Sequence, residues 1–254
     1  MARSMLRPTL ISLSLATLLA SLQFASEPSQ QDETIPKVDR ENRELAGWKL
    51  SIDRRLLSND LSQTERAIDL LRTQLEEIVR VVPKPALAEL QKVPLWITSE
   101  YSKVPPRAEY HPGADWLKNH GRDPAMAKGI EFTNVKIFEA ETRRMPNFAL
   151  HELAHAYHDR FLPKGFGNQE IKSAFDQAKS SGIYDRVERQ DSEGRKRDDK
   201  AYAITNPQEY FAEFTEAFFA RNDFVPYDAD ELRRHDPTMF ALLEKLWGVA
   251  PRRE

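Results

Sequence analysis

Two histidines and a glutamate stand together in the segment His-Glu-Leu-Ala-His at positions 151–155. In a helix, four residues turn through about 400°, so His151 and His155 would point to one side and could bind one ion. Glu152 would lie about 100° around that helix, outside the coordination sphere but within reach of a water at the metal. His151 and His155 are therefore candidate metal ligands, and Glu152 is a candidate general base for hydrolysis.

An ordinary core helix with two hydrogen-bonded histidines is the competing interpretation of this segment. The residues around the motif are apolar enough to bury the helix: Phe148, Leu150, Leu153, Ala154 and Tyr157. Burying two imidazoles and a carboxylate together without an ion is expensive, because each group loses its hydration. We therefore favour a metal site.

A third ligand must come from elsewhere in the chain, because catalytic zinc takes three protein ligands and keeps one position open for water. The close downstream spacing of the metzincin pattern holds no histidine or aspartate. A second helix can deliver a carboxylate, and the candidates there are Glu209, Glu213 and Glu216. Glu209 also falls three residues after Asn206, where a capping box places its glutamate, so it could instead serve the backbone.

The segment 202–214 resembles part of the anthrax lethal factor type of zinc peptidase, a gluzincin-type zincin family that includes small secreted Pro-Pro endopeptidases. That family pairs a His-Glu-x-x-His helix with a tyrosine, a glutamate seven residues later and a second glutamate four beyond. Tyr202, Glu209 and Glu213 reproduce this spacing. The resemblance covers about residues 145–219 at motif level, and it implies a zincin-like fold with a peptide or protein as substrate.

The resemblance also implies a role for each matching residue. His151, His155 and Glu209 would ligate one Zn²⁺ ion. Glu152 would be the general base, and Tyr202 would donate a hydrogen bond to the developing oxyanion. The alternative for Tyr202 is a packing or surface tyrosine beside a charged loop.

Other polar residues near the motif have supporting roles or none. Glu213 is a candidate acceptor for the N–H of a ligating imidazole, since such partners orient metal histidines. Asp159, one turn beyond His155, competes for that role, and we expect His158 not to be a ligand. The aromatic residues on the second helix are expected to pack in the core: Tyr210, Phe211, Phe214, Phe218 and Phe219.

These residues must be positioned by strands and helices, and the order of the strand and helix patterns along the chain predicts an α+β fold with a small mixed sheet and a helical C-terminal half. Three segments have strand patterns: 48–52, 94–98 and 129–138, the last with a bulge where its alternation slips. Five segments have helical patterns: 62–82, 146–161, 168–181, 207–221 and 237–247. Segment 104–124 is predicted to be a long ordered loop, and 186–200 a solvated loop or mobile hairpin.

Two helix starts are marked by a capping residue before a proline, at Asn206-Pro207 and Asp236-Pro237. The strand at 130–137 precedes the metal helix. In zincin folds that place belongs to an edge strand along which an extended peptide pairs, and by analogy we expect the same here.

The chain as a whole limits the classes of function. Its 254 residues carry a formal net charge of −3 with a pI near 6.1, which gives no basic surplus for nucleic acid. The chain contains no cysteine, so cysteine nucleophiles and cysteine metal sites are excluded. Its length suits one catalytic domain, expected at 43–250.

The first 25 residues have a basic start followed by an apolar run from Leu10 to Leu22. This pattern is typical of a signal peptide, and the run is shorter than the roughly 20 residues that a membrane span needs. We expect a signal peptide at 1–25 and a disordered leader at 26–42. The mature protein would then be secreted or periplasmic, without stable membrane insertion.

The function predicted from these features is that of a secreted zinc metallopeptidase. Two alternatives stay open: a zinc-dependent amidase that acts on a cell-wall link, and a catalytically silent zinc-binding module of the cell surface. The presence of both Glu152 and Tyr202 argues against the silent module.

Overall fold

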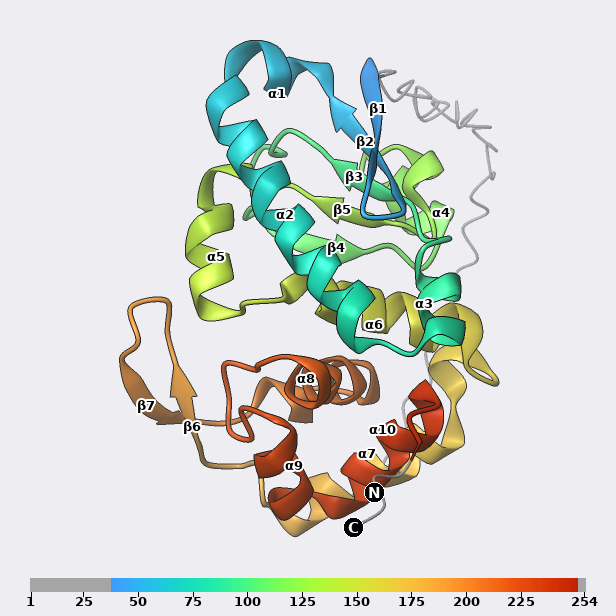
Figure 1. Ribbon diagram of the computed structural model, residues 1–254, viewed down its shortest axis with the longest axis vertical. Helices are drawn as coiled ribbons and strands as arrows, with labels where there is room; N and C mark the ends of the chain where they lie inside the picture. Colours follow the sequence, from blue (N-terminus) through green and yellow to red (C-terminus); the bar gives the residue numbers. More distant parts are fainter. Residues whose placement is uncertain (1–37, 251–254) are drawn as a thin grey trace, which may run out of the picture. The chain divides into compact units, whose positions relative to one another are not determined.

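In the computed structural model, which describes residues 38–250, a five-stranded mixed sheet in the first half of the chain is followed by a mostly helical second half (Figure 1). The predicted α+β class is confirmed. The expected signal peptide lies outside the described residues, as does most of the expected leader. The first strand nevertheless starts at Arg40, so residues 40–42 belong to the sheet and not to a disordered leader.

The strand order of the sheet is β1-β2-β3-β5-β4. The three inner strands run parallel to one another: β2 (Trp48–Asp53), β3 (Leu95–Ile97) and β5 (Ile130–Phe132). The two edge strands run antiparallel to their neighbours: β1 (Arg40–Leu45) and β4 (Ala108–Tyr110). The strand predicted over 130–137 is therefore not an edge strand. The edge beside it is β4.

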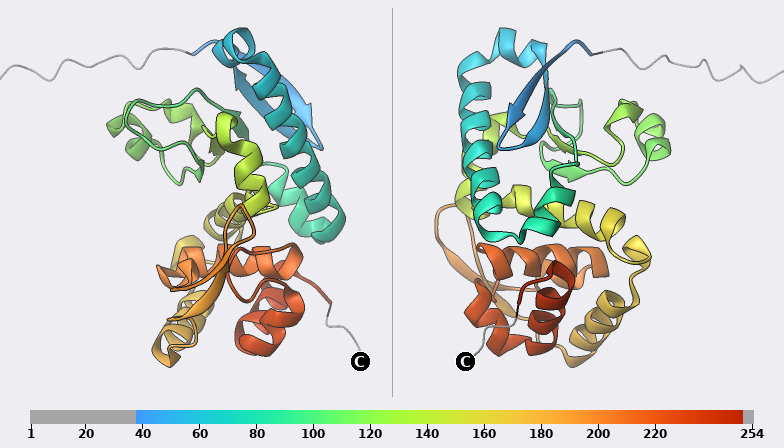
Figure 2. Two further views of the ribbon diagram at one scale, coloured as in Figure 1. Left: turned by 90° about the vertical axis from the view of Figure 1, so that its left-hand side faces the viewer. Right: turned by 45° about the vertical axis from the view of Figure 1, so that its right-hand side comes forward.

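A long amphipathic helix packs against the sheet. This helix, α2 (Leu61–Val81), lies along one face of the sheet in all the ribbon views (Figure 1, Figure 2). Its buried residues recur at helical spacing: Ile68, Leu71, Leu75 and Ile78. They bury one apolar stripe against the sheet, which is why the sequence pattern predicted this helix correctly. Two short helices flank it, α1 (Arg54–Asn59) and α3 (Lys84–Leu90).

Two predictions for the middle of the chain are wrong. The expected loop at 104–124 contains β4 and helix α4 (Ala114–Asn119), both too short to give a clear period. The strand expected over 129–138 is only the three residues of β5, followed by a 3₁₀ turn at Val135–Ile137 and helix α5 (Phe138–Arg144). The slip in alternation marks this change from strand to helix rather than a bulge.

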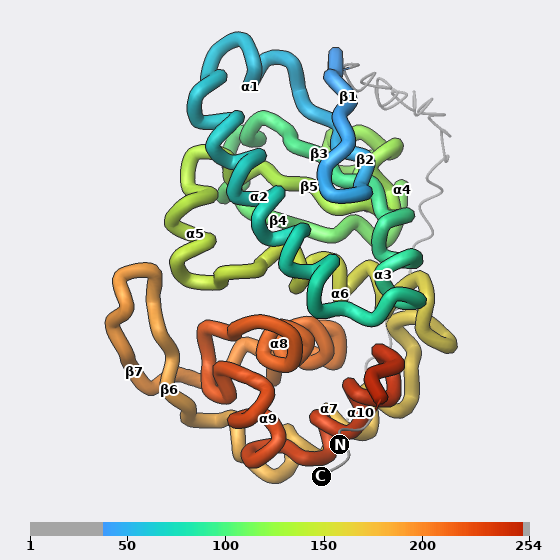
Figure 3. The backbone as a smooth tube through the Cα atoms, viewed as in Figure 1, coloured from blue at the N-terminus to red at the C-terminus, as the bar shows by residue number. Residues whose placement is uncertain are grey.

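Helices dominate the second half of the described chain. They are α6 (Phe148–Phe161), α7 (Gln169–Ser181), α8 (Pro207–Phe219), α9 (Ala229–His235) and α10 (Pro237–Trp247). The two predicted helix starts are confirmed, because the side chains of Asn206 and Asp236 accept hydrogen bonds from backbone N–H groups in the first turns of α8 and α10. Between α7 and α8 the chain forms a hairpin, β6 (Val187–Gln190) and β7 (Lys196–Asp199), traced in Figure 3.

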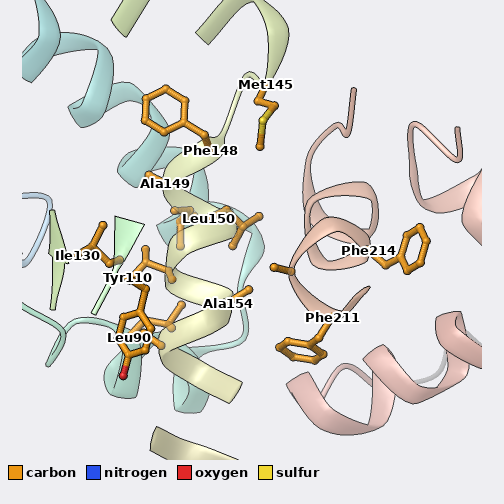
Figure 4. Close-up of a cluster of buried hydrophobic side chains, with 14 of the residues drawn as sticks. Leu90, Tyr110, Ile130, Met145, Phe148, Ala149, Leu150, Ala154, Phe211 and Phe214 are labelled. Atoms are coloured by element: carbon orange, nitrogen blue, oxygen red, sulfur yellow. The ribbon is translucent and has the colours of Figure 1, made fainter. Parts of the chain in front are cut away.

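Helix α6 is the central element, with the sheet on one side and α8 on the other. In Figure 4, Tyr110 and Ile130 lie on the sheet side of α6, whereas Phe211 and Phe214 belong to α8 on the opposite side. The start of α6 is fixed by Asn147, whose side-chain amide donates to the carbonyl oxygen of Gln74 on α2 at 3.0 Å. Within residues 38–250, no helix combines the length and apolar character that crossing a membrane requires.

Candidate metal centre

Helices α6 and α8 bring three donor atoms together. The Nε2 atoms of His151 and His155 are 3.1 Å apart, and Oε2 of Glu209 lies 3.1 Å from the first and 3.4 Å from the second. Tetrahedral zinc with bonds of about 2.0–2.1 Å would separate its ligands by about 3.3–3.4 Å. The three atoms are therefore nearly at coordination spacing, and the group can hold a metal ion.

The side chain of Glu209 does not cap α8. Its backbone N–H donates to Oδ1 of Asn206 at 2.9 Å, so the cap is completed by the asparagine alone. The carboxylate turns instead toward the two histidines. Burial by itself would raise the pKa of Glu209, but the hydrogen bonds with His151 and His155 outweigh it and hold the pKa far below its usual range. The carboxylate is therefore ionised and can donate an electron pair to a metal ion.

A second buried carboxylate orients His151. Its Nδ1 atom lies 2.7 Å from Oε1 of Glu216 and 3.6 Å from Oε1 of Glu213, so the nearest partner is Glu216 and not the predicted Glu213. With Nδ1–H donating to Glu216, the lone pair on Nε2 is left for a metal. Burial opposes a charged His151 ring, but the hydrogen bonds with Glu209 and Glu216 prevail and raise its pKa well above the ordinary value.

Two acidic residues of α8, Glu213 and Glu216, are buried next to this group. Burial raises the pKa of Glu216 to about 7, and burial together with the nearby charge of Glu216 raises the pKa of Glu213. Within the described part of the chain, Oε2 of each of these two residues has no hydrogen-bond partner. A cation at the His-His-Glu group would lower the electrostatic cost of this cluster.

The other two polar residues weighed from the sequence, Asp159 and His158, form no hydrogen bond with the three donor atoms. Asp159 accepts hydrogen bonds from the hydroxyl of Tyr110 at 2.6 Å and from Nζ of Lys128, so it does not orient a ligating histidine. His158 is fully buried between the rings of Phe166 and Phe211. Burial lowers the pKa of His158 to about 4, and neither of its ring nitrogens has a partner among residues 38–250.

Glu152 faces the edge strand β4. Its Oε2 atom accepts the backbone N–H of Tyr110 at 2.8 Å. Glu152 also lines a cavity of about 710 Å³ together with His151, His155 and Glu209. The candidate base and the candidate ligands therefore share one space that a substrate could enter.

Tyr202, from a 3₁₀ turn before α8, lines the same cavity and is 49% exposed. Partial burial, aided by the charge of Glu209, raises the pKa of its hydroxyl above the usual value. The hydroxyl therefore keeps its proton at neutral pH and can act as a hydrogen-bond donor. Its place at the cavity wall, and not in the core, leaves the side chain accessible to a bound molecule.

One wall of the cavity is built by residues that sequence reasoning missed. Asp223, just after α8, accepts from Arg144 of α5 at 3.0 Å and from Arg189 of β6 at 3.1 Å. Tyr110 was missed as well. No local motif marks these residues, because their contacts join segments 34 to 79 positions apart in the sequence.

The site also includes part of the charged hairpin, since Arg189 lines the cavity.

In comparisons with protein-family models, curated proteins and solved structures, no match to this chain was found. The site is thus defined by its own geometry: a buried His-His-Glu group on α6 and α8 that can hold a metal ion, beside a glutamate and an edge strand.

Proposed function

We propose that this protein is a zinc-dependent peptidase that acts outside the cytoplasm. The observation that carries the proposal is the convergence of His151, His155 and Glu209 at coordination spacing, with Glu152 beside them in one cavity. The local resemblance of residues 145–219 to the lethal factor type of zinc peptidase supports the same function.

Zinc is the metal that this donor set suits best. Two imidazoles and one carboxylate form a ligand set of hydrolytic zinc sites, whereas magnesium and calcium prefer sites made of oxygen atoms. A zinc ion bound there supplies Lewis acidity, which polarises a carbonyl and lowers the pKa of water.

We assign the proton transfers of the proposed reaction to Glu152. Its Oε2 atom is held by the backbone N–H of Tyr110. Among residues 38–250, no hydrogen bond engages Oε1, which is free to take a proton from water and return it to the leaving amine. A positioned general base of this kind contributes about 10²- to 10⁴-fold to the rate. Tyr202 would donate its hydroxyl to the carbonyl oxygen of the scissile bond.

Strand β4 offers a surface for an extended peptide. Arg107 and His111 carry backbone hydrogen bonds to Thr133 and Gly129 on the β5 side. In an antiparallel pair the bonding direction alternates, so the N–H and C=O groups of Ala108 and the C=O group of Tyr110 face away from β5. Residues 107–110 line the cavity, and a substrate strand could pair along them. This edge favours a peptide over a cell-wall amide.

The extracytoplasmic part of the proposal rests on residues 1–25, whose pattern is that of a signal peptide. The absence of cysteine from the chain is compatible with an oxidising compartment. Detecting the N-terminus of the exported protein by mass spectrometry would test this part by itself.

The decisive experiment incubates the zinc-loaded protein, without residues 1–25, with a diverse peptide library and identifies new termini by mass spectrometry. Glu152→Gln is the control, because glutamine can still accept the Tyr110 N–H but cannot serve as a base. We expect both proteins to bind one zinc ion and only the wild type to cut. If both bind zinc and neither cuts, the peptidase proposal is wrong.

A further inference from the structure

We infer that Tyr110 and Asp159 form a latch that positions Glu152 by fixing the edge strand β4 on helix α6. The inference rests on the proposed function for its catalytic consequence, but the latch itself has an independent readout. Tyr110 and Asp159 are positioning residues, since neither contacts the three donor atoms.

The latch follows from two contacts made by one tyrosine. The backbone N–H of Tyr110 donates to Glu152 at 2.8 Å, and its hydroxyl donates to Oδ2 of Asp159 at 2.6 Å. Residues 152 and 159 are seven positions apart on α6, which is about 10.5 Å along the axis and about 20° from a common line. Tyr110 therefore lies along one face of the helix and is held at both ends. Figure 4 shows its ring beside α6 with the hydroxyl oxygen pointing toward the C-terminal end of that helix.

Lys128 makes a further contact with Asp159. Lys128, in the turn before β5, donates from Nζ to the same Asp159 oxygen, and its backbone N–H donates to the carbonyl oxygen of His111 at 2.7 Å. Its carbonyl oxygen accepts from Arg160 of α6 at 3.0 Å. Lys128 has a φ of +61°, a left-handed conformation that a lysine rarely adopts. Several contacts thus hold this turn on the end of α6.

An ion pair on the protein surface is the simpler interpretation of Lys128 and Asp159, and such pairs contribute little. The Lys128 side chain is 48% exposed, so its ion pair with Asp159 contributes little, but the Tyr110–Asp159 bond is largely shielded from water. The Asp159 side chain is only 14% exposed, and Tyr110 is only 6% exposed, packed edge-on against the ring of Phe166. A buried hydroxyl that donates to a mostly buried carboxylate is a strong, directional contact.

The latch matters because β4 is only three residues long and its other edge faces the cavity. Pairing with β5 fixes the register of β4, but it does not fix the distance between β4 and α6. The Tyr110–Asp159 bond fixes that distance, and with it the angle at which the Tyr110 N–H holds Glu152. A displacement of about 1 Å at a reacting group can cost on the order of 10²-fold in rate.

Four variants test the latch in the zinc-loaded protein. Tyr110→Phe and Asp159→Ala each remove the bond. Asp159→Asn keeps an oxygen that can accept from Tyr110, so it should recover most of the function. Tyr157→Phe is the matched control, because Tyr157 also lies on α6 and donates its hydroxyl to a carbonyl, that of Leu246, away from the base.

The first readout is the amide hydrogen exchange of Tyr110, followed by NMR. We expect exchange at least about tenfold faster in Tyr110→Phe and Asp159→Ala, with Asp159→Asn and Tyr157→Phe close to the wild type. Equal exchange in Asp159→Ala and the wild type would overturn the latch, whatever the protein hydrolyses. This readout also separates the latch from the peptidase proposal, which fails alone if the wild type cuts no peptide.

The second readout is steady-state kinetics on a peptide that the wild type cleaves. We expect kcat to fall on the order of tenfold in Tyr110→Phe and Asp159→Ala, with KM and zinc affinity unchanged. A purely structural role would instead change zinc affinity or KM. An unchanged kcat in both variants, or an Asp159→Asn enzyme as impaired as Asp159→Ala, would overturn the inference.

Discussion

Glu216 lies 2.7 Å from Nδ1 of His151, while Glu213, one turn earlier on α8, is 3.6 Å from the same nitrogen. Both carboxylates are buried. The difference in distance assigns the orienting hydrogen bond to Glu216. It also makes the two glutamates a matched pair for experiment.

Glu216→Ala should therefore weaken zinc binding by about 10- to 100-fold, because the tautomer and orientation of the His151 ring lose their support. Glu213→Ala removes the same number of atoms from the same helix, and its effect should be less than tenfold. Competition with a chelating dye measures both affinities. Equal losses in the two variants would contradict the assignment.

Tyr202→Phe tests the proposed oxyanion donor. Because the side chain is 49% exposed, loss of the hydroxyl should leave stability and zinc content unchanged. The rate should fall on the order of 10²- to 10³-fold, mostly in kcat, as for other donors of this kind. Turnover at the wild-type level would show that Tyr202 is only part of the cavity wall.

Removal of the metal should destabilise the fold. Free zinc at 100 times its Kd stabilises the native state by about 2.7 kcal/mol, and each kcal/mol moves Tm by about 2–4 °C for a domain of 150–250 residues. We expect this shift in thermal unfolding with and without a chelator. It should vanish in His155→Ala and persist in His158→Leu, since His158 is packed between aromatic rings away from the donor atoms. Loss of the shift in His158→Leu would make His158 part of the site.

Acid stability should depend on Asp53, which caps α1 and is fully buried. Burial alone would raise the pKa of Asp53, but hydrogen bonds from Arg55 and Ser99 outweigh it and lower the pKa to about 2. The unfolded chain has a pKa of about 3.9 and binds this proton first as the pH falls. The stabilisation is therefore complete above about pH 4 and is lost between about pH 4 and pH 2.

Asp53→Asn keeps a capping oxygen but removes the charge, so it isolates this effect. Denaturant unfolding of both proteins at several pH values measures the difference in the free energy of unfolding. The wild type should be more stable at pH 6, and the gap should shrink below about pH 4. A gap that is constant with pH would contradict the proposed titration.

Local chemistry in the sequence predicted the parts of the site that lie on one helix. The four-residue spacing of His151 and His155 placed both imidazoles on one side of α6. The Asn206-Pro207 pair placed the start of α8 correctly. These features follow from helical period and capping, which depend on neighbours in the chain.

The parts that sequence reasoning missed depend on contacts between distant segments. Strand β4 has only three residues, so alternation cannot reveal it, yet its Tyr110 backbone holds Glu152 across 42 positions of sequence. The choice between Glu213 and Glu216 depends on how α8 is rotated against α6. A rotation of this kind is set by packing in the core, and no pattern of residue spacing in the sequence reveals it.

The placement of Glu209 on a different helix from the histidines has a consequence for how the protein matures. Its carboxylate meets the His151 ring across 58 positions of sequence, through the packing of α8 on α6. A nascent or unfolded chain can present the histidine pair of one helical segment, but it cannot present all three donor atoms. Tight capture of an ion at this group would therefore be a late event in folding. A bound metal would then report that α6 and α8 have already packed together.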